Sequence, residues 1–553
     1  MTTRAQANRA SEAPAGAPHD AVLARLVGEV RTGRSIGGMP PLPGPIHVTL
    51  RDHGRACATF WQPDGQIGAA LAAAVTLAGR EGADTLQVDL GDAPERVAPK
   101  DLRSAFPNAA RGILGLGVAL DGTTTWFAPS QMIATNRSFL RAVELELARR
   151  GIDAGTFAAR GGYFLRFRAR QILIRLAPEV EVLTLLRGGR LVRPEACTPS
   201  MIRDMIEGMA GWMRANLHGD GQMTYKYWPS RGEESSADNT IRQFMATLCL
   251  IRIAARTGRA GDLERAEANL GRNLDRFYRP AGEIGTIAFG GSAKLGAAAL
   301  AALAILEAPF GVRFQKVLER LEAGVMALRQ PDGSFRTFHE PAERNDNQNF
   351  YPGEALLFLA ERLRRRPDPA LLVQCLESAR WYQSWHLRNR NPAFIPWHSQ
   401  AAARLLEIAG EAWLRDWVFE MNDWLALFQQ WDRAPCPDLA GRFYDPSRPG
   451  LGPPHASSTG VYLEGLADAL ALAEAAGDEA RAALYRRTVW RGIRSLRQLQ
   501  FKDEVDLFYV RNRERVQGGV RTEAYDNTIR VDNVQHGLMA LLKLERMAGF
   551  ASA

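Results

Sequence analysis

The sequence has few cysteines and no paired cysteine motif. Its five cysteines are scattered over 553 residues without CxxC spacing. Disulfide frameworks use even sets of closely spaced cysteines, and structural zinc sites use CxxC pairs. We therefore expect neither disulfides nor a metal site, and this cysteine usage favours a reducing compartment.

The sequence also lacks the apolar segments of secreted and membrane proteins. Its first 20 residues have no apolar core of a secretory signal. No later stretch reaches about 18 uninterrupted apolar residues, the length that spans a membrane. Residues 1–18 have too little apolar content to offset the entropy of ordering. We expect a disordered leader, no membrane insertion and a cytoplasmic location.

Basic stripes and common nucleotide or nucleophile motifs are missing as well. The net charge of +8 comes from 69 basic and 61 acidic residues that are interspersed, so we expect no nucleic-acid partner. There is no Gly-x-Ser-x-Gly elbow, Walker loop or Rossmann fingerprint, and we expect no cofactor. Mild positive charge suits a glycan or another acidic or polar small molecule. The oligomeric state is left open.

Residues 45–191 predict an α/β domain that follows a leader and linker over residues 1–44. Two amphipathic helices are expected at Gln66–Arg80 and Phe139–Arg150. Five β-type runs alternate with them. These runs are Ile46–Leu50, Thr85–Leu90, Gly115–Leu120, Tyr163–Phe167 and Val180–Leu185.

The start of this domain carries a partial resemblance. The strand His47–Leu50, the segment Gly54–Cys57 and the Ala-rich helix after them resemble the α/β family named after a gene of the AMME syndrome region. Ala56 stands where that family has Gly. The resemblance implies a fold and no activity, and we expect Cys57 to be a small buried residue rather than a reactive thiol.

From residue 197 to 550 the pattern is a sixfold alternation of two kinds of helix. Small-residue helices that are apolar on most faces predict an inner layer, and helices with a charged face predict an outer layer. Inner helices are expected to begin near Asn239, Ser292, Pro352, His398, Ser458 and Asn533. Outer helices are expected over Pro199–Asn216, Gly261–Tyr278, Val312–Arg329, Pro369–Leu387, Glu411–Gln430 and Asp478–Leu499. This alternation predicts an (α/α)6 toroid.

The loops of the toroid predict which rim binds a ligand. Connections from inner to outer helices are short, whereas most of those from outer to inner helices are long. Long ordered loops on one rim are typical of a binding side. We expect β-hairpins in the Gly-X-aromatic stretches of these loops, namely Gly221–Tyr225, Asp332–Phe335, Gly441–Tyr444 and Asp506–Tyr509.

A repeated pentad marks the same rim. Asp238–Arg242 at the first inner helix returns as Asp526–Arg530 before the last one, and the first and last units of a closed ring are neighbours. Helix capping explains one Asp or Asn per helix, but not the arginines. The alternative to capping is that both pentads belong to one functional site. We expect the pentads to form one side of it, opposite the third unit.

The rim mixes carboxylates, histidines, arginines and aromatic rings, which is the composition that a glycan site requires. Core packing is the competing interpretation for any single aromatic residue. The candidate catalytic residues are Asp238, Asp346, Glu354, Asp532, His398 and His536. The candidate substrate-binding residues are Tyr227, Trp228, Arg242, Tyr351, Trp397, Tyr444, His455, Tyr462, Tyr525 and Arg530.

The predicted toroid resembles the (α/α)6 carbohydrate-active enzymes, which include glycoside hydrolases, uronate lyases and sugar epimerases. The resemblance implies a saccharide substrate and acid/base work at inner-helix N-termini. Hydrolysis would use paired carboxylates, separated by about 6.5–9.5 Å for inversion. An epimerase or lyase would use His or Tyr as a base near Arg242 or Arg530. A non-catalytic glycan- or peptide-binding scaffold is the third alternative.

Overall fold

The computed structural model describes residues 20–32, 40–176 and 179–550. The predicted disordered leader, residues 1–18, lies outside them. Part of the predicted leader and linker is helical instead, because α2 (Asp20–Arg31) buries Leu23, Leu26 and Val27. These side chains pack with those of α3 (Ile67–Glu81), so residues 20–31 contribute to a core.

The N-terminal part is built on an eight-stranded sheet in which every strand pair is antiparallel. The strand order is β2-β1-β3-β7-β5-β6, and β4 and β8 also pair with β7. The strands are β1 (Ile46–Asp52), β2 (Arg55–Gln62), β3 (Thr85–Gly91), β4 (Glu95–Val97), β5 (Leu114–Leu120), β6 (Thr123–Phe127), β7 (Tyr163–Arg175) and β8 (Glu181–Leu185). The five expected runs are confirmed as strands.

Two clusters of apolar side chains hold this part together. One joins α2 and α3 to β1 and β3, and the other joins α6 (Phe139–Arg149) and α7 (Ala154–Ala159) to β5. A short helix, α5 (Pro129–Thr135), follows β6. The expectation that Cys57 is buried is wrong, because β2 is an edge strand and Cys57 is exposed on it.

Six inner helices form a closed ring, as the sequence predicts. Each contacts the next, and the last contacts the first. They are α9 (Thr240–Thr257), α11 (Leu295–Glu307), α13 (Tyr351–Arg365), α15 (Ile395–Ala409), α17 (Ala456–Ala475) and α19 (Val531–Leu544). Small residues permit close packing, since a Cβ on Gly353 would lie 2.6 Å from the Cβ of Trp397.

Six outer helices surround this ring, and each packs mainly on one inner helix. They are α8 (Pro199–Ala215), α10 (Ala260–Phe277), α12 (Gln315–Ala327), α14 (Pro369–Arg388), α16 (Ala412–Ala426) and α18 (Glu479–Leu499). Their apolar stripes face the ring and their charged faces remain outside. The (α/α)6 arrangement therefore follows from the contacts of the chain's own helices.

The long loops differ in detail from the expected hairpins. Three of the Gly-X-aromatic stretches pair with a residue just after the preceding outer helix, through one isolated bridge each: Leu217 with Met223, Arg329 with Phe335, and Gln429 with Phe443. Strands form elsewhere in these loops. One sheet has the order β10-β9-β16-β15, and another has the order β11-β12-β13-β14.

The first of these sheets includes the second pentad. Its strands are β9 (Lys226–Trp228), β10 (Glu233–Glu234), β15 (Arg521–Glu523) and β16 (Asp526–Arg530). The second sheet has β11 (Tyr278–Ala281), β12 (Ile284–Phe289), β13 (Ser292–Lys294) and β14 (Phe338–Glu340). Because residues 292–294 pair as β13, α11 begins three residues later than the expected Ser292.

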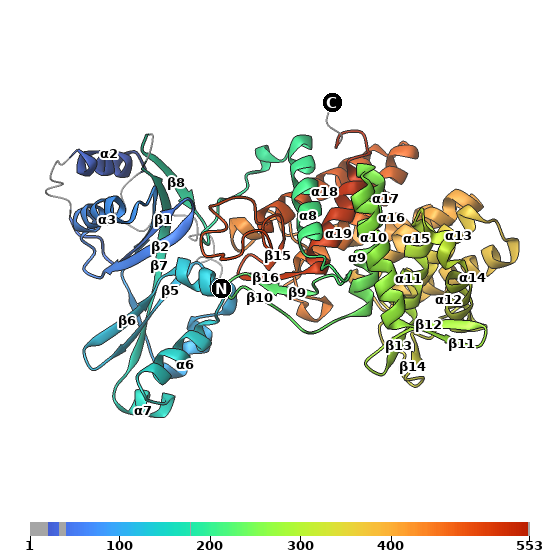
Figure 1. The fold of residues 1–553 in the computed structure, drawn as a ribbon, viewed down its shortest axis with the longest axis horizontal. Helices are drawn as coiled ribbons and strands as arrows, with labels where there is room; N and C mark the ends of the chain where they lie inside the picture. The colour runs from blue at the N-terminus through green and yellow to red at the C-terminus, as the bar shows by residue number, and fades with distance from the viewer. Residues whose placement is uncertain (1–19, 33–39, 177–178, 551–553) are drawn as a thin grey trace.

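The N-terminal part contacts the loops of the ring. Nε of Arg187 lies 2.7 Å from Oδ2 of Asp438, and both side chains are buried. Asn136, at the end of α5, donates to Oδ1 of Asp526 at 3.0 Å. Figure 1 shows β15 and β16 between the N-terminal sheet and the inner helices. We retain the division into domains at residues 45–191 and 197–550 as a proposal.

Among the described residues, no helix is both long enough and apolar enough to cross a membrane.

Candidate active site

One buried carboxylate joins the first and last units of the ring. Asp532, in the first turn of α19, accepts from Nε of Arg242 at 2.9 Å and from Nε of Arg530 at 2.9 Å. Burial alone would raise the pKa of Asp532, but the two guanidinium charges hold it well below its usual range. Asp532 is therefore ionised at neutral pH and orients both cations.

A second buried carboxyl group, that of Glu354, has a raised pKa, whereas the pKa of Asp532 is lowered. Glu354, in the first turn of α13, is 2% exposed, and its Oε2 is buried without a hydrogen-bond partner in the described residues. Burial raises the pKa of Glu354 to about 8, although the charges of Arg242 and Lys294 oppose the shift. The carboxyl group is therefore mostly protonated at neutral pH, the state that a general acid requires.

The neighbouring inner helix shapes the position of Glu354. A Cβ on Gly296 of α11 would lie 1.9 Å from Oε2 of Glu354 and 2.7 Å from Cδ1 of Tyr351. Only a residue without a side chain leaves room for this carboxyl group. Tyr351 is itself buried, and burial raises the pKa of its hydroxyl, which stays protonated at neutral pH.

A histidine and a glutamate face each other between the fifth and sixth units. Nε2 of His455, the residue before α17, lies 3.4 Å from Oε1 of Glu523 on β15. Burial and the charge of Arg530 lower the pKa of His455, which favours the neutral imidazole. Burial raises the pKa of Glu523, whose Oε2 has no hydrogen-bond partner among the described residues.

A second histidine pairs with a carboxylate deeper in the ring. Nδ1 of His536 on α19 lies 2.8 Å from Oε1 of Glu464 on α17. The Trp397 ring lies near His536, with ring centroids 6.0 Å apart. A carboxylate on one imidazole nitrogen fixes the tautomer and leaves the other nitrogen for proton transfer.

These groups share one electrostatic environment. Arg242 acts on the pKa values of Glu354, Asp532 and His455, so the first, third, fifth and sixth units converge. Lys294 joins them from the second unit, and its pKa is lowered by burial and by neighbouring arginines. The cluster thus offers the cationic groups of Arg242, Arg530 and Lys294 to an anionic ligand.

Two predicted catalytic aspartates have other partners. Oδ1 of Asp238 accepts from the backbone N of Asn239 and from Nε2 of Gln243, both at 2.8 Å, while its buried Oδ2 has no hydrogen-bond partner in the described chain. Asp346 lies on an exposed loop, where hydrogen bonds from Arg344 lower its pKa. Their catalytic role stays a prediction.

The structure does not support a catalytic role for His398. Its side chain is fully buried and stacks on Phe394 at 3.5 Å between ring centroids, and burial lowers its pKa to about 3. The inner helix expected to begin near His398 begins three residues earlier, at Ile395. The histidine thus lies a turn inside the helix, where it packs near Tyr382 and Trp417 of the outer layer.

The remaining predicted aromatic residues divide by exposure. Tyr227 is buried and lies beneath the guanidinium of Arg515, so packing accounts for it. Trp228 is partly exposed on β9. Tyr444 and Tyr462 line a recess of about 10 Å³ at the fifth unit. Tyr525 is partly exposed beside Glu523 and Arg442, and burial raises the pKa of its hydroxyl.

The candidate list omitted several residues of the cluster. Lys294 directly precedes an apolar helix, and Glu464 lies two residues after Tyr462, so both had a signal in the sequence. Arg442 and Glu523 are brought in by long-range folding. Arg111 lies in the N-terminal part. Burial lowers the pKa of its guanidinium, and the charges of Asp526 and Glu523 oppose that shift.

Metal-ligand geometry is found away from the ring. In the described ranges, Asp52, His53 and Asp84 alone place three potential ligand atoms within 4.8 Å of one another. They belong to the N-terminal part, on and after β1 and before β3.

Comparison with known proteins gives fold neighbours only. No family model and no curated protein matches the chain. Similar solved structures include an alpha-1,6-mannanase of Salegentibacter, a D-mannose isomerase and a cellobiose 2-epimerase of Bacillus thermoamylovorans. In that order, their sequences are 11%, 12% and 10% identical to this chain, with TM-scores of 0.43, 0.45 and 0.46. Each match covers 62% of this chain, and covers 98%, 97% and 98% of the respective neighbour. Carbohydrate-active enzymes are thus among its structural neighbours, as the sequence resemblance predicted.

Proposed function

We propose that this protein is a carbohydrate-active enzyme that hydrolyses a glycosidic bond, with Glu354 as the general acid. The observation that carries the proposal is the burial of the Glu354 carboxyl group at an inner-helix N-terminus with one oxygen unpaired among the described residues, which raises its pKa and favours the protonated form. Such a group can deliver its proton to a leaving oxygen and is regenerated by water.

The charge of the cluster supports an acidic saccharide. Arg242 and Arg530 are 28% and 20% exposed at their side chains, and the bonds to Asp532 fix their planes. Asp532 accepts from Nε of both arginines, and the N–H groups at the far end of each guanidinium can bind a substrate carboxylate. The proposed substrate is therefore an oligosaccharide that contains a uronic acid.

Hydrolysis also needs an ionised carboxylate to activate water. Asp532 suits this role poorly, because two arginines lower its proton affinity. Asp238 suits it better, since its Oδ2 accepts no hydrogen bond within the described residues and its one ion pair, with Arg276, is long at 3.9 Å. We assign the base to Asp238, with Asp346 as the alternative on the third unit.

A second candidate function is epimerisation or elimination of a uronate in the same cluster. The pair of His455 and Glu523 favours it, because a neutral imidazole held beside a carboxyl group can remove a proton from carbon. Arg242 or Arg530 would stabilise the charge that develops on the substrate carboxylate.

The test is turnover of a panel of neutral and uronate-containing oligosaccharides by the full chain in D₂O, followed by mass spectrometry. Hydrolysis is expected on the acidic members. Glu354→Gln should lower the rate by about 10²-fold or more. Glu343→Gln is the matched control, since Glu343 is exposed on the loop before α13.

The products separate the alternatives. If the wild type incorporates deuterium at a ring carbon without cleaving the substrate, and His455→Gln does not, the reaction is epimerisation and not hydrolysis. An unsaturated product would indicate a lyase. Saturable binding of the oligosaccharide without any turnover would refute the proposed enzymatic activity and support a non-catalytic binding scaffold.

A further inference from the structure

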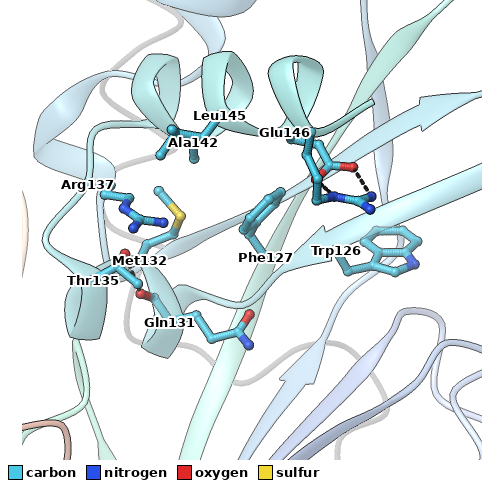
Figure 2. Close-up of a pocket in the computed structure, with 10 residues that line it drawn as sticks. Trp126, Phe127, Gln131, Met132, Thr135, Arg137, Ala142, Leu145 and Glu146 are labelled. Carbon is cyan, nitrogen blue, oxygen red and sulfur yellow. Dashed lines mark hydrogen bonds and ion pairs between the residues drawn. The ribbon is translucent and has the colours of Figure 1, made fainter. Parts of the chain in front are cut away.

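A cavity of about 360 Å³ lies in the N-terminal part, apart from the inner helices. Figure 2 shows that β6, α5 and α6 surround it. Phe127, Met132, Ala142 and Leu145 supply apolar walls. This volume is near the lower end of the range for small-molecule sites, about 300–1,000 Å³.

The polar groups around this cavity are biased towards donors. Gln131 accepts at Oε1 from the backbone N of Ala128 at 2.9 Å, which leaves its amide N–H groups for a ligand. Arg149 is neutralised by Glu146, with two bonds of 2.8 Å. The cavity therefore offers hydrogen-bond donors without a spare carboxylate of its own.

Arg137 differs from Arg149 in having no acidic partner. Among the residues that the structure describes, Arg137 forms no ion pair. In Figure 2 its guanidinium group points from the loop after α5 towards Met132. An unpaired cation at an apolar cavity favours a ligand that brings its own negative charge.

We propose that this cavity binds a small apolar carboxylate, with the apolar body between Phe127 and Met132 and the carboxylate on Arg137. The ligand fits the volume if it is about the size of one to three rings, by the same size range. The site is separate from the rim cluster, so it stands whether or not the protein acts on saccharides.

The test uses two fluorescent probes with the full chain: the anionic anilinonaphthalene sulfonate and the uncharged N-phenylnaphthylamine. Both should bind the wild-type protein. Arg137→Gln should weaken the anionic probe about tenfold, which is the loss of one charge-assisted bond, and leave the neutral probe unchanged. Ala142→Leu should weaken both, because it fills the cavity.

Two matched control variants lie on α6. Arg141→Gln removes a cation that pairs with Glu144, and Ala148→Leu adds volume to an exposed position. Both should bind the probes like the wild type. Benzoate should displace the anionic probe from the wild type and not from Arg137→Gln. The proposal is overturned if neither probe binds, or if Arg137→Gln, which is exposed and should fold, binds both like its control.

Discussion

Nε of Arg242 on α9 lies 2.9 Å from Oδ2 of Asp532 on α19, so one ion pair joins the first and last inner helices. Arg530 holds the other oxygen of the same carboxylate. A carboxylate between two guanidinium groups stays ionised and fixes them in place. The positive charge of the rim thus depends on the contact that closes the ring.

Asp532→Asn should destabilise the fold by about 3–5 kcal/mol, because it leaves Arg242 and Arg530 partly buried without their counter-ion. Urea unfolding measures this change. Asp346→Asn, on an exposed loop, should stay within about 0.5 kcal/mol of the wild type. A helix-capping role for Asp532 would instead let Asn substitute without loss, so equal stability of Asp532→Asn and the wild type would contradict the ion-pair account.

Gly296→Ala should displace Glu354, since the added Cβ would lie 1.9 Å from its Oε2. We expect loss of turnover of at least tenfold and a changed basic limb of the pH profile, because a displaced carboxyl group loses its buried environment. Gly271→Ala on α10 is the control, with no atom within 4 Å of the new Cβ. Unchanged turnover in Gly296→Ala would show that the position of Glu354 does not matter.

The stability difference between the wild type and Glu354→Gln should depend on pH. The pKa of Glu354 is raised from 4.5 to about 8 on folding, so its contribution is fully present below pH 4.5 and is lost as pH rises through 8. Urea unfolding of both proteins over a pH series measures this. The wild type should lose stability relative to Glu354→Gln towards alkaline pH, and a constant difference would refute the raised pKa.

Arg187→Met should destabilise the protein by about 3–5 kcal/mol, because it leaves Asp438 buried without its partner. The double variant Arg187→Met with Asp438→Leu should recover much of that loss, since apolar residues of similar volume replace a buried ion pair well. Chemical unfolding of the four proteins gives the coupling. Additive losses would show that the two residues act independently.

The helical ring could be predicted from the sequence because its signal is local. The run Leu295–Glu307 has small or apolar residues on nearly every face, which only a helix buried on all sides tolerates. The charged faces of the outer helices repeat at helical spacing and place them within a few residues of their observed bounds. Both signals are contained within single helices.

Parts of the site could not be predicted because they depend on distant pairing. The pentads have the same sequence, yet Asn239 caps α9 while Asp526–Arg530 pairs as β16 with β9, about 300 residues away. Arg111 reaches Asp526 only through docking of the N-terminal part. The short helix Pro392–Phe394 precedes α15 and moves His398 inward.

The most direct test of the account is the protonation state of Glu354 itself. Infrared difference spectra of the wild type and Glu354→Gln would follow the stretch of a protonated carboxyl group across pH, with Glu343→Gln as the control. We predict a band that disappears with an apparent pKa of about 8 and is missing in Glu354→Gln alone. Identical spectra for all three proteins above about pH 6 would show that Glu354 is already ionised and would contradict its role as the general acid.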